Sequence, residues 1–183
     1  MSLVFGANTS DQVSVAAATS INTLPTRTVL LWVYVTTFTA NRNYWTKNSA
    51  NAFTVSGTAG DVRLAIDQAT TDTTYITNSA PVILNTWTCL AFTYDQAVTP
   101  RHHIYAGTLS VAMTEATYGT ATDGSGDAND DSAGAWLWGN RAAADRALQG
   151  RIGPAMAWNR VLTLGELRDQ QYHPRVTNGC VVF

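Results

Sequence analysis

The pattern of hydrophobic and polar positions predicts β-strands along most of the chain. Within residues 61–67 the two kinds alternate, so Val62, Leu64 and Ile66 fall on one face of an extended segment and charged residues on the other. Such a strand covers a core with one face and meets water with the other. Residues 28–38 are instead apolar at both parities, which predicts a central strand with both faces covered.

Many other segments are rich in Thr, Val and aromatic residues, which half-buried strands prefer. They cover residues 3–5, 12–16, 43–47, 52–57, 74–78, 86–94, 102–107, 109–114, 135–139, 147–158 and 176–183. Short strands separated by Gly, Asn, Asp or Pro indicate an antiparallel sandwich or barrel. Residues 119–134 are predicted to form a long polar loop. Pro154 cannot donate to a sheet ladder, so its strand should be an edge or carry a bulge there.

One helix is predicted near the C-terminus. Thr163 and Glu166 have the spacing of a capping box, in which each side chain satisfies a backbone N–H at the start of a helix. Two leucines give the segment an apolar side, and Pro174 follows it. We therefore expect a helix over residues 164–172 that packs on the sandwich.

Length and composition narrow the possible functions. The 183 residues fit one domain spanning residues 1–183, and only 13% of them are charged, against about 25% in typical globular proteins. A net charge of −2 without any basic run argues against nucleic-acid binding. The longest apolar run, residues 29–35, is far shorter than a membrane span, and no signal peptide is visible. Cys89 and Cys180 match no metal motif; they are either separate thiols or one long-range bridge.

The order of several motifs points to a known family. A strand runs from Trp87 to Asp95, and the chain closes with Gly150-Arg151-Ile152, a short strand, Asn159-Arg160-Val161-Leu162-Thr163 and an acidic residue that opens a helix. The chain thereby resembles, over nearly its whole length, the laminin-G-like jelly rolls of the concanavalin A-like lectin/glucanase superfamily. The resemblance implies an all-β fold, an antiparallel two-sheet β-sandwich with one short C-terminal helix. It also implies ligands held at loop rims or in a concave sheet. Gly153-Pro154 stands where the family often has an acidic residue, so any role of that carboxylate does not carry over.

Glycoside hydrolysis needs two carboxyl groups on either side of the sugar bond, about 5.5 Å apart in retaining enzymes. The two glutamates do not form such a pair, since Glu115 follows a predicted strand and Glu166 has a capping role. Asp61 and Asp67 share a face but lie about 20 Å apart along an extended strand. The adjacent His102 and His103 point to opposite faces and cannot bind one metal together, while His173 precedes a proline. We expect the protein not to be an enzyme.

The most acidic stretch suggests a calcium site. Asp127, Asn129 and Asp131 have the D-x-N-x-D spacing that places hard oxygen ligands around calcium, and Asp123 lies just before them. The EF-hand pattern fails, because Ser132 replaces its glycine. The loop is therefore either a calcium site or a solvated acidic loop.

A sugar site needs exposed aromatic rings beside planar polar groups. Tyr44 and Trp45, with Arg42 and Asn43 next to them, are the candidates because they follow an Asn-rich turn. Core packing is the alternative for each tryptophan, including Trp136 and Trp138, which share a face.

Two functional classes follow. One is a carbohydrate-binding lectin module that recognises cell-surface glycans. The other is a structural protein of the phage virion surface, a capsid decoration or a tail or fibre component, with virion structural proteins as partners and a homo-oligomer, for example a trimer, as its assembly. The second is favoured because the sequence begins at Met1 without a signal peptide or a catalytic partner domain, as in modules carried on phage particles.

Overall fold

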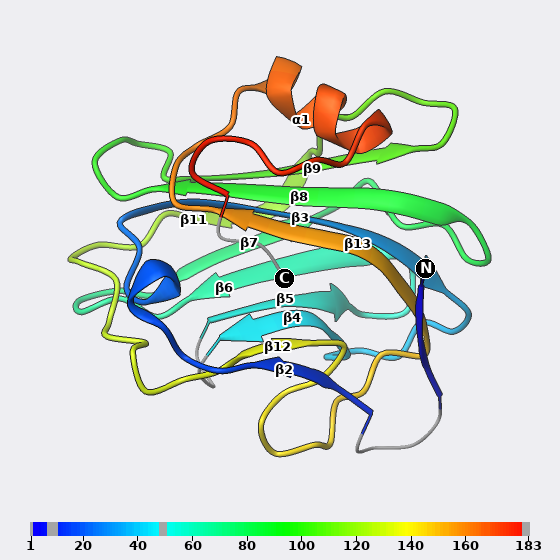
Figure 1. Ribbon diagram of the computed structural model, residues 1–183, viewed down its shortest axis with the longest axis horizontal. Coiled ribbons are helices and arrows are strands. Elements are labelled where there is room, and N and C mark those ends of the chain that lie inside the picture. The colour runs from blue at the N-terminus through cyan, green and yellow to red at the C-terminus, as the bar shows by residue number, and fades with distance from the viewer. Residues whose placement is uncertain (1, 7–10, 48–50, 181–183) are drawn as a thin grey trace.

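The computed structural model describes residues 2–6, 11–47 and 51–180, which form two packed antiparallel sheets (Figure 1). The six-stranded sheet has the order β1 (Leu3–Phe5), β13 (Gly150–Trp158), β3 (Thr26–Val35), β8 (Trp87–Asp95), β9 (His102–Thr108) and β10 (Thr114–Glu115). The seven-stranded sheet has the order β11 (Tyr118–Thr122), β7 (Thr73–Thr77), β6 (Asp61–Ile66), β5 (Asn51–Ser56), β4 (Asn43–Lys47), β12 (Trp136–Trp138) and β2 (Val13–Val15). A 3-10 turn, η1 (Thr19–Ile21), and one helix, α1 (Leu164–Tyr172), complete the fold. The predicted two-sheet sandwich with a short C-terminal helix is confirmed.

The main core lies between the sheets. Val62, Leu64 and Ile66 of β6 are fully buried in it, as their alternation predicts. Strand β3 pairs with β13 on one side and β8 on the other, so it is central in its sheet. Its odd-numbered residues from Val29 to Val35 enter the main core, and its even-numbered Leu30 and Trp32 enter a second apolar cluster on the outer face. The prediction of two covered faces is therefore confirmed.

Helix α1 covers part of that outer face, as Figure 1 shows above β8, β3 and β13. The predicted capping box is present, because Thr163 Oγ1 accepts a hydrogen bond from Glu166 N and the Glu166 carboxylate accepts one from Thr163 N. Leu167 is fully buried against Met156 and Trp158 in the second cluster. Among the residues that the structure describes, no helix is long and apolar enough to cross a membrane.

Some predicted boundaries are wrong. Residues 109–113 form a turn rather than a strand, because Thr108 Oγ1 accepts hydrogen bonds from the amides of Ser110 and Val111 and closes the chain on itself. The predicted polar loop begins with strand β11, an exposed edge whose threonines pair with β7. Within the described part of the tail, Cys180 makes an isolated bridge to Trp158; residues 181–183 lie outside the described residues.

Candidate functional site

The aromatic rings predicted to form an exposed glycan platform at residues 42–45 are not exposed, because Tyr44 and Trp45 are fully buried and Asn43 nearly so. The register of β4 against β5 shifts between Asn43 and Trp45, and this irregularity lets two consecutive aromatic residues enter the same core. Trp45 packs on Phe92, with ring centroids 5.2 Å apart. Only Arg42 keeps a partly exposed side chain. Trp136 and Trp138 are also core residues, the alternative that the sequence left open.

The four residues predicted to hold calcium each bind different groups of the protein. Asp123 accepts from the Arg101 amide, and Asp127 accepts from Gln96 Nε2 at 2.6 Å. Asn129 donates to the Asp67 carboxylate at 2.8 Å. Asp131 turns inward. In the described part of the chain, no three His, Cys, Asp or Glu side chains gather as a metal site would need, so the structure does not bring the predicted ligands together.

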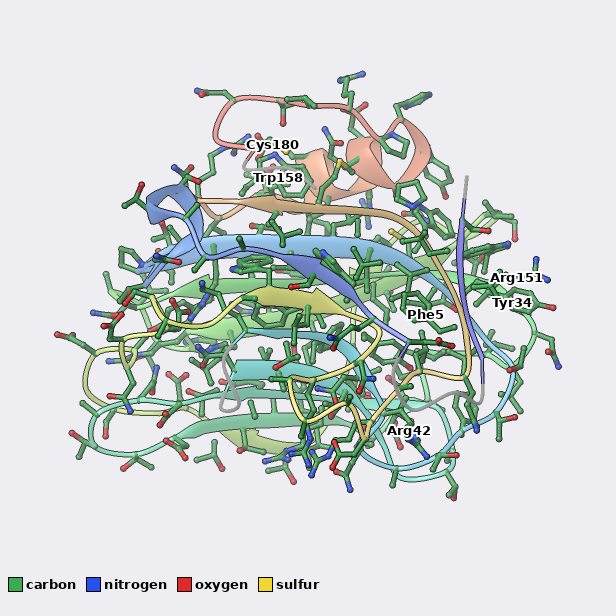
Figure 2. All side chains as sticks on the ribbon, turned by 60° about the horizontal axis from the view of Figure 1, so that its bottom comes forward. Phe5, Tyr34, Arg42, Arg151, Trp158 and Cys180 are labelled. Atoms are coloured by element: carbon green, nitrogen blue, oxygen red, sulfur yellow. The ribbon has the colours of Figure 1, made fainter. Side chains whose placement is uncertain are left out.

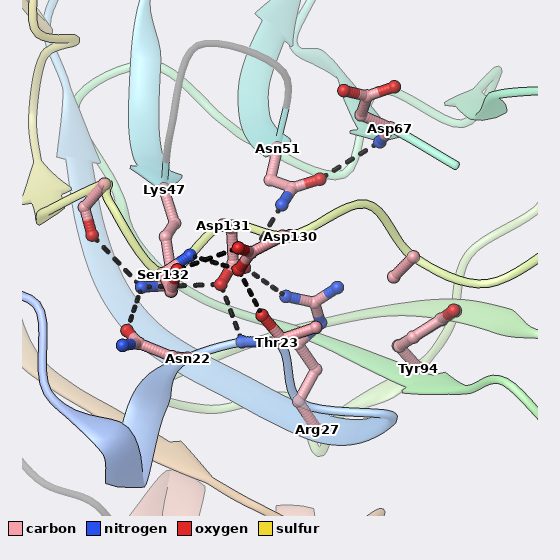
Figure 3. Close-up of polar contacts among 12 residues, drawn as sticks. Asn22, Thr23, Arg27, Lys47, Asn51, Asp67, Tyr94, Asp130, Asp131 and Ser132 are labelled. Atoms are coloured by element: carbon pink, nitrogen blue, oxygen red, sulfur yellow. Dashed lines mark hydrogen bonds and ion pairs between the residues drawn. The ribbon is translucent and has the colours of Figure 1, made fainter. Parts of the chain in front are cut away.

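Asp131 is instead the anchor of its loop (Figure 3). It is 1% exposed and accepts hydrogen bonds from Thr23 N at 2.6 Å and from Asn51 Nδ2 at 3.3 Å. Arg27 Nη1 lies 3.5 Å and Lys47 Nζ 3.6 Å from its carboxylate oxygens. The positive charge beside this carboxylate is therefore supplied by two side chains of the protein itself.

Both cations are deeply buried. Lys47 Nζ also donates to Asn22 Oδ1 at 2.8 Å and to the Gly134 carbonyl at 3.1 Å. Desolvation lowers the pKa of the Lys47 ammonium, while the Asp131 carboxylate opposes that shift. Arg27 packs over the Tyr94 ring, 5.0 Å from its centroid, and burial lowers the pKa of its guanidinium as well. The cluster fixes the loop to the sandwich and leaves Asp131 inaccessible from solvent.

A pocket with accessible aromatic rings lies on the outer face of the six-stranded sheet, beside α1. It has a volume of about 540 Å³ and is lined by Ser2, Trp32, Trp87, Leu109, Gly153, Pro154, Gln171, Tyr172 and Pro174. We call it the aromatic pocket. The Trp87 side chain is partly exposed and Tyr172 is 42% exposed, so both can meet a ligand.

Strand β13 shapes this pocket through the predicted irregularity at Pro154. Its register against β3 shifts between Ile152 and Ala155, and its pairing with β1 ends at Ile152. The expectation of a bulge in this strand is confirmed. A Cβ atom on Gly153 would lie 3.1 Å from Trp32 Cβ and 3.3 Å from Trp87 Cζ3. Glycine at this position therefore keeps the indole of Trp87 uncovered.

The aromatic surface continues from the pocket across three strands. Tyr34 on β3 lies opposite Trp87 on β8 and Arg151 on β13. The Tyr34 and Trp87 ring centroids are 5.6 Å apart, and the Arg151 guanidinium lies 5.7 Å from the Tyr34 ring centroid. Figure 2 shows Tyr34 and Arg151 side by side at this face. The exposed Arg151 adds a charged hydrogen-bond donor next to the aromatic rings.

Gln171 fixes the helix side of the pocket. Its Oε1 accepts from Met113 N at 2.7 Å, and its Nε2 donates to the carbonyls of Thr108 and Val111. This side chain therefore ties α1 to the turn after β9. Because the pocket needs side chains from β3, β8, β13 and α1 together, no local motif could identify it. The available signal was that Trp32, Tyr34 and Trp87 occupy the parity that faces away from the main core.

Comparison with known proteins identifies a family for the sequence and solved structures with a similar fold. Residues 7–168 match the family model Laminin_G_3, described as the concanavalin A-like lectin/glucanases superfamily. The comparison with curated proteins finds no match.

Solved structures with the same fold share little sequence with this chain. A candidate carbohydrate-binding protein from Bacteroides ovatus has 17% identity and a TM-score of 0.65, over 97% of this chain and 48% of that protein. This chain thus spans about half of that protein's length. Domain 4 of the GH43 extracellular arabinanase AbnA from Geobacillus stearothermophilus, in complex with arabinotriose, has 16% identity and a TM-score of 0.57, over 88% and 73%. The enzymatically active domain of tailspike protein 2 from bacteriophage CBA120 has 9% identity and a TM-score of 0.61, over 93% and 30%. At these identities the likeness shows the fold.

Proposed function

The chain belongs to the concanavalin A-like lectin/glucanases superfamily, and on that basis we propose that it binds a saccharide in the aromatic pocket. The observation that carries the proposal is the partly exposed Trp87 indole in an apolar pocket of about 540 Å³. This volume lies within the ~300–1,000 Å³ of ordinary ligand pockets. An indole offers a flat apolar face to the C–H side of a sugar ring, and Arg151 offers donors to its hydroxyls.

The test is a glycan array followed by titration calorimetry with the best oligosaccharide. Trp87→Ala should weaken binding roughly tenfold or more, because it removes the largest accessible ring, and Trp87→Phe should keep part of the affinity. Ile83→Ala is the matched control, since Ile83 is 53% exposed and lies outside the aromatic pocket. Unchanged affinity in a folded Trp87→Ala protein would rule this pocket out.

Binding without catalysis is part of the proposal. Both glutamates have other roles: Glu115 Oε1 lies 2.7 Å from His103 Nδ1 and accepts from Tyr118, while Glu166 caps α1 and pairs with Arg160. We therefore expect no reducing ends to appear when the protein is incubated with the oligosaccharide it binds. Release that persists in repurified protein and disappears on Glu115→Gln would contradict this.

A more specific proposal is that the protein lies on the surface of a phage particle. It is supported by the similarity of its fold to the CBA120 tailspike domain. On this proposal the domain presents its glycan-binding face to a bacterial cell surface and assembles with virion structural proteins, as a trimer or another homo-oligomer. Capsid or tail genes next to its own gene, together with a stable oligomer in light-scattering measurements, would support it. A monomer encoded among carbohydrate-metabolism genes would favour the lectin module instead.

A further inference from the structure

The outer face of the seven-stranded sheet carries a second pocket of a different kind. It has a volume of about 180 Å³ and is lined mainly by Ala52, Thr54, Arg63, Ala65, Thr74 and Arg146. We call it the arginine pocket. It contains no aromatic ring, and it lies on the opposite sheet from the aromatic pocket, so an inference about it does not depend on the function proposed above.

Strand register places these residues on one face. Ala52 pairs with Ala65, Ala65 pairs with Thr74, and Thr54 pairs with Arg63. Paired residues of neighbouring strands point to the same side, and the alternate positions, such as Leu64, point into the core. The small alanine side chains keep the floor of the pocket low between the threonine hydroxyls and the Arg63 guanidinium.

Arg146 reaches the pocket from the loop between β12 and β13, and its backbone is held from two sides. Its amide donates to Asn140 Oδ1 at 3.0 Å, and its carbonyl accepts from Asn43 N at 3.0 Å. Asn140 is fully buried and also donates to the Asp11 carbonyl. The loop therefore fixes the backbone of Arg146 before any ligand arrives, which reduces the backbone entropy that binding would lose.

The residues that line the pocket include two arginines and one acid. Asp61 and Asp67 share the outward parity of Arg63, and their carboxylates accept hydrogen bonds from neutral groups of the protein. Within the described ranges, the side chains of Arg63 and Arg146 make no hydrogen bond or ion pair, and both are partly exposed. Asp145, the acid beside Arg146 in the sequence, is engaged by Arg141 in two contacts of 2.5 Å. The acid that lines the pocket is Asp72, an exposed residue whose Oδ1 accepts from Gln68 N.

A third guanidinium belongs to the same region. Arg42 Nη1 donates to the Asp145 carbonyl at 3.1 Å, which places this side chain against the loop that carries Arg146. Its Nε is buried and has no partner among the described residues. Figure 2 shows Arg42 at this side of the molecule, away from Tyr34 and Arg151.

From this geometry we infer that the arginine pocket binds the acid group, carboxylate or sulfate, of an anionic saccharide. Planar guanidinium groups form paired, charge-assisted hydrogen bonds to such acid groups, and the threonine hydroxyls and Asp72 suit the hydroxyls of the attached sugar. The volume is smaller than the ~300 Å³ at which ordinary ligand pockets begin. It therefore suits one charged group with its sugar ring rather than a whole oligosaccharide.

The test is calorimetry at low ionic strength with tetragalacturonate, its fully methyl-esterified form and a sulfated galactan tetrasaccharide. The proposal expects at least one acidic ligand to bind and the neutral ester to bind at least tenfold more weakly. Affinity should fall as salt is added. Binding of the uronate would identify a carboxylate as the acid group, and binding of the sulfated galactan alone would identify a sulfate.

Two variants and one control locate the binding. Arg63→Gln and Arg146→Gln should each weaken the acidic ligand roughly ten- to hundredfold. Their melting temperatures should stay unchanged, because neither side chain holds the fold. Arg175→Gln removes the same charge from an exposed site after α1 and should leave affinity intact. Equal binding of acid and ester, no binding of either acid, or full affinity in both folded pocket variants would each overturn the inference.

Discussion

Replacing Asp131 with Asn should strongly destabilise the protein. The change keeps the shape of the side chain but removes the negative charge that faces Arg27 and Lys47, 3.5 and 3.6 Å away. All three side chains are at most 2% exposed, so water cannot take over the role of the carboxylate. Removing one partner of a buried ion pair leaves an uncompensated charge and typically costs about 3–5 kcal/mol.

The assay is urea unfolding followed by tryptophan fluorescence, with thermal melting alongside. For a domain of this size, such a loss lowers the melting temperature by roughly 6–20 °C. Asp130→Asn is the matched control one residue away: its carboxylate is exposed and accepts from Thr23 Oγ1 and Ser132, so its loss should have a small effect. A second variant tests the cause directly, because adding Lys47→Met to Asp131→Asn removes one stranded cation and should recover part of the stability.

Two outcomes would refute this reasoning. If Asp131→Asn lost no more stability than Asp130→Asn, the buried charges would not anchor the loop. If Lys47→Met made the Asp131→Asn protein still less stable, the stranded positive charge would not be the source of the loss.

Since Arg27 and Lys47 already neutralise Asp131, excess calcium or a chelator should leave the melting temperature unchanged. A melting temperature that rises with calcium would instead support the predicted calcium site. His102 is fully buried between Tyr75 and Tyr94, and desolvation lowers the pKa of its imidazole to about 2. The unfolded chain binds this proton below about pH 6.5 and the folded chain does not, so stability should fall from pH 6.5 to pH 5. His102→Phe should flatten that slope in urea titrations, and an unchanged slope would contradict the assignment. Gly153→Val should abolish binding in the aromatic pocket while the protein still binds its acidic ligand, because the added side chain fills the space before Trp87; full saccharide affinity in this variant would contradict the pocket's role.

The sequence predicts well what is decided locally. The alternation in β6 places Val62, Leu64 and Ile66 in the core, and the capping box of Thr163 and Glu166 places α1 within the bounds expected for it. Both patterns involve residues only a few positions apart, so contacts with the rest of the chain have little effect on the structures that they predict.

The candidate sites depend on contacts between residues far apart in the sequence, and these contacts could not be predicted from the sequence. The D-x-N-x-D spacing of the acidic loop suggests calcium, yet Asp131 is turned inward by Arg27 and Asn51, which lie 104 and 80 positions away in the sequence. Tyr44 and Trp45 fail as a surface platform because the register shift between β4 and β5 cannot be read from β4 alone. The arginine pocket is missed for the same reason, since Arg63 and Arg146 are 83 positions apart in the numbering of the chain.

The outer faces of the two sheets differ because different kinds of residue occupy the outward-pointing positions of their strands. Strand β3 is apolar at both parities, so its outward residues need a cover. The nine residues of α1 span about 14 Å, whereas the ten residues of β3 span about 33 Å, so the helix covers less than half of that strand. Trp32 is buried in the second cluster, whereas Tyr34 and Trp87 stay partly exposed, which leaves apolar rings for a saccharide to meet. Strand β6 is polar at its outward parity, so its face needs no cover and presents Arg63 to solvent. The same rule of alternation thus gives one sheet an aromatic outer surface and the other a polar one, which holds the arginine pocket, and the two proposed sites require different ligands for that reason.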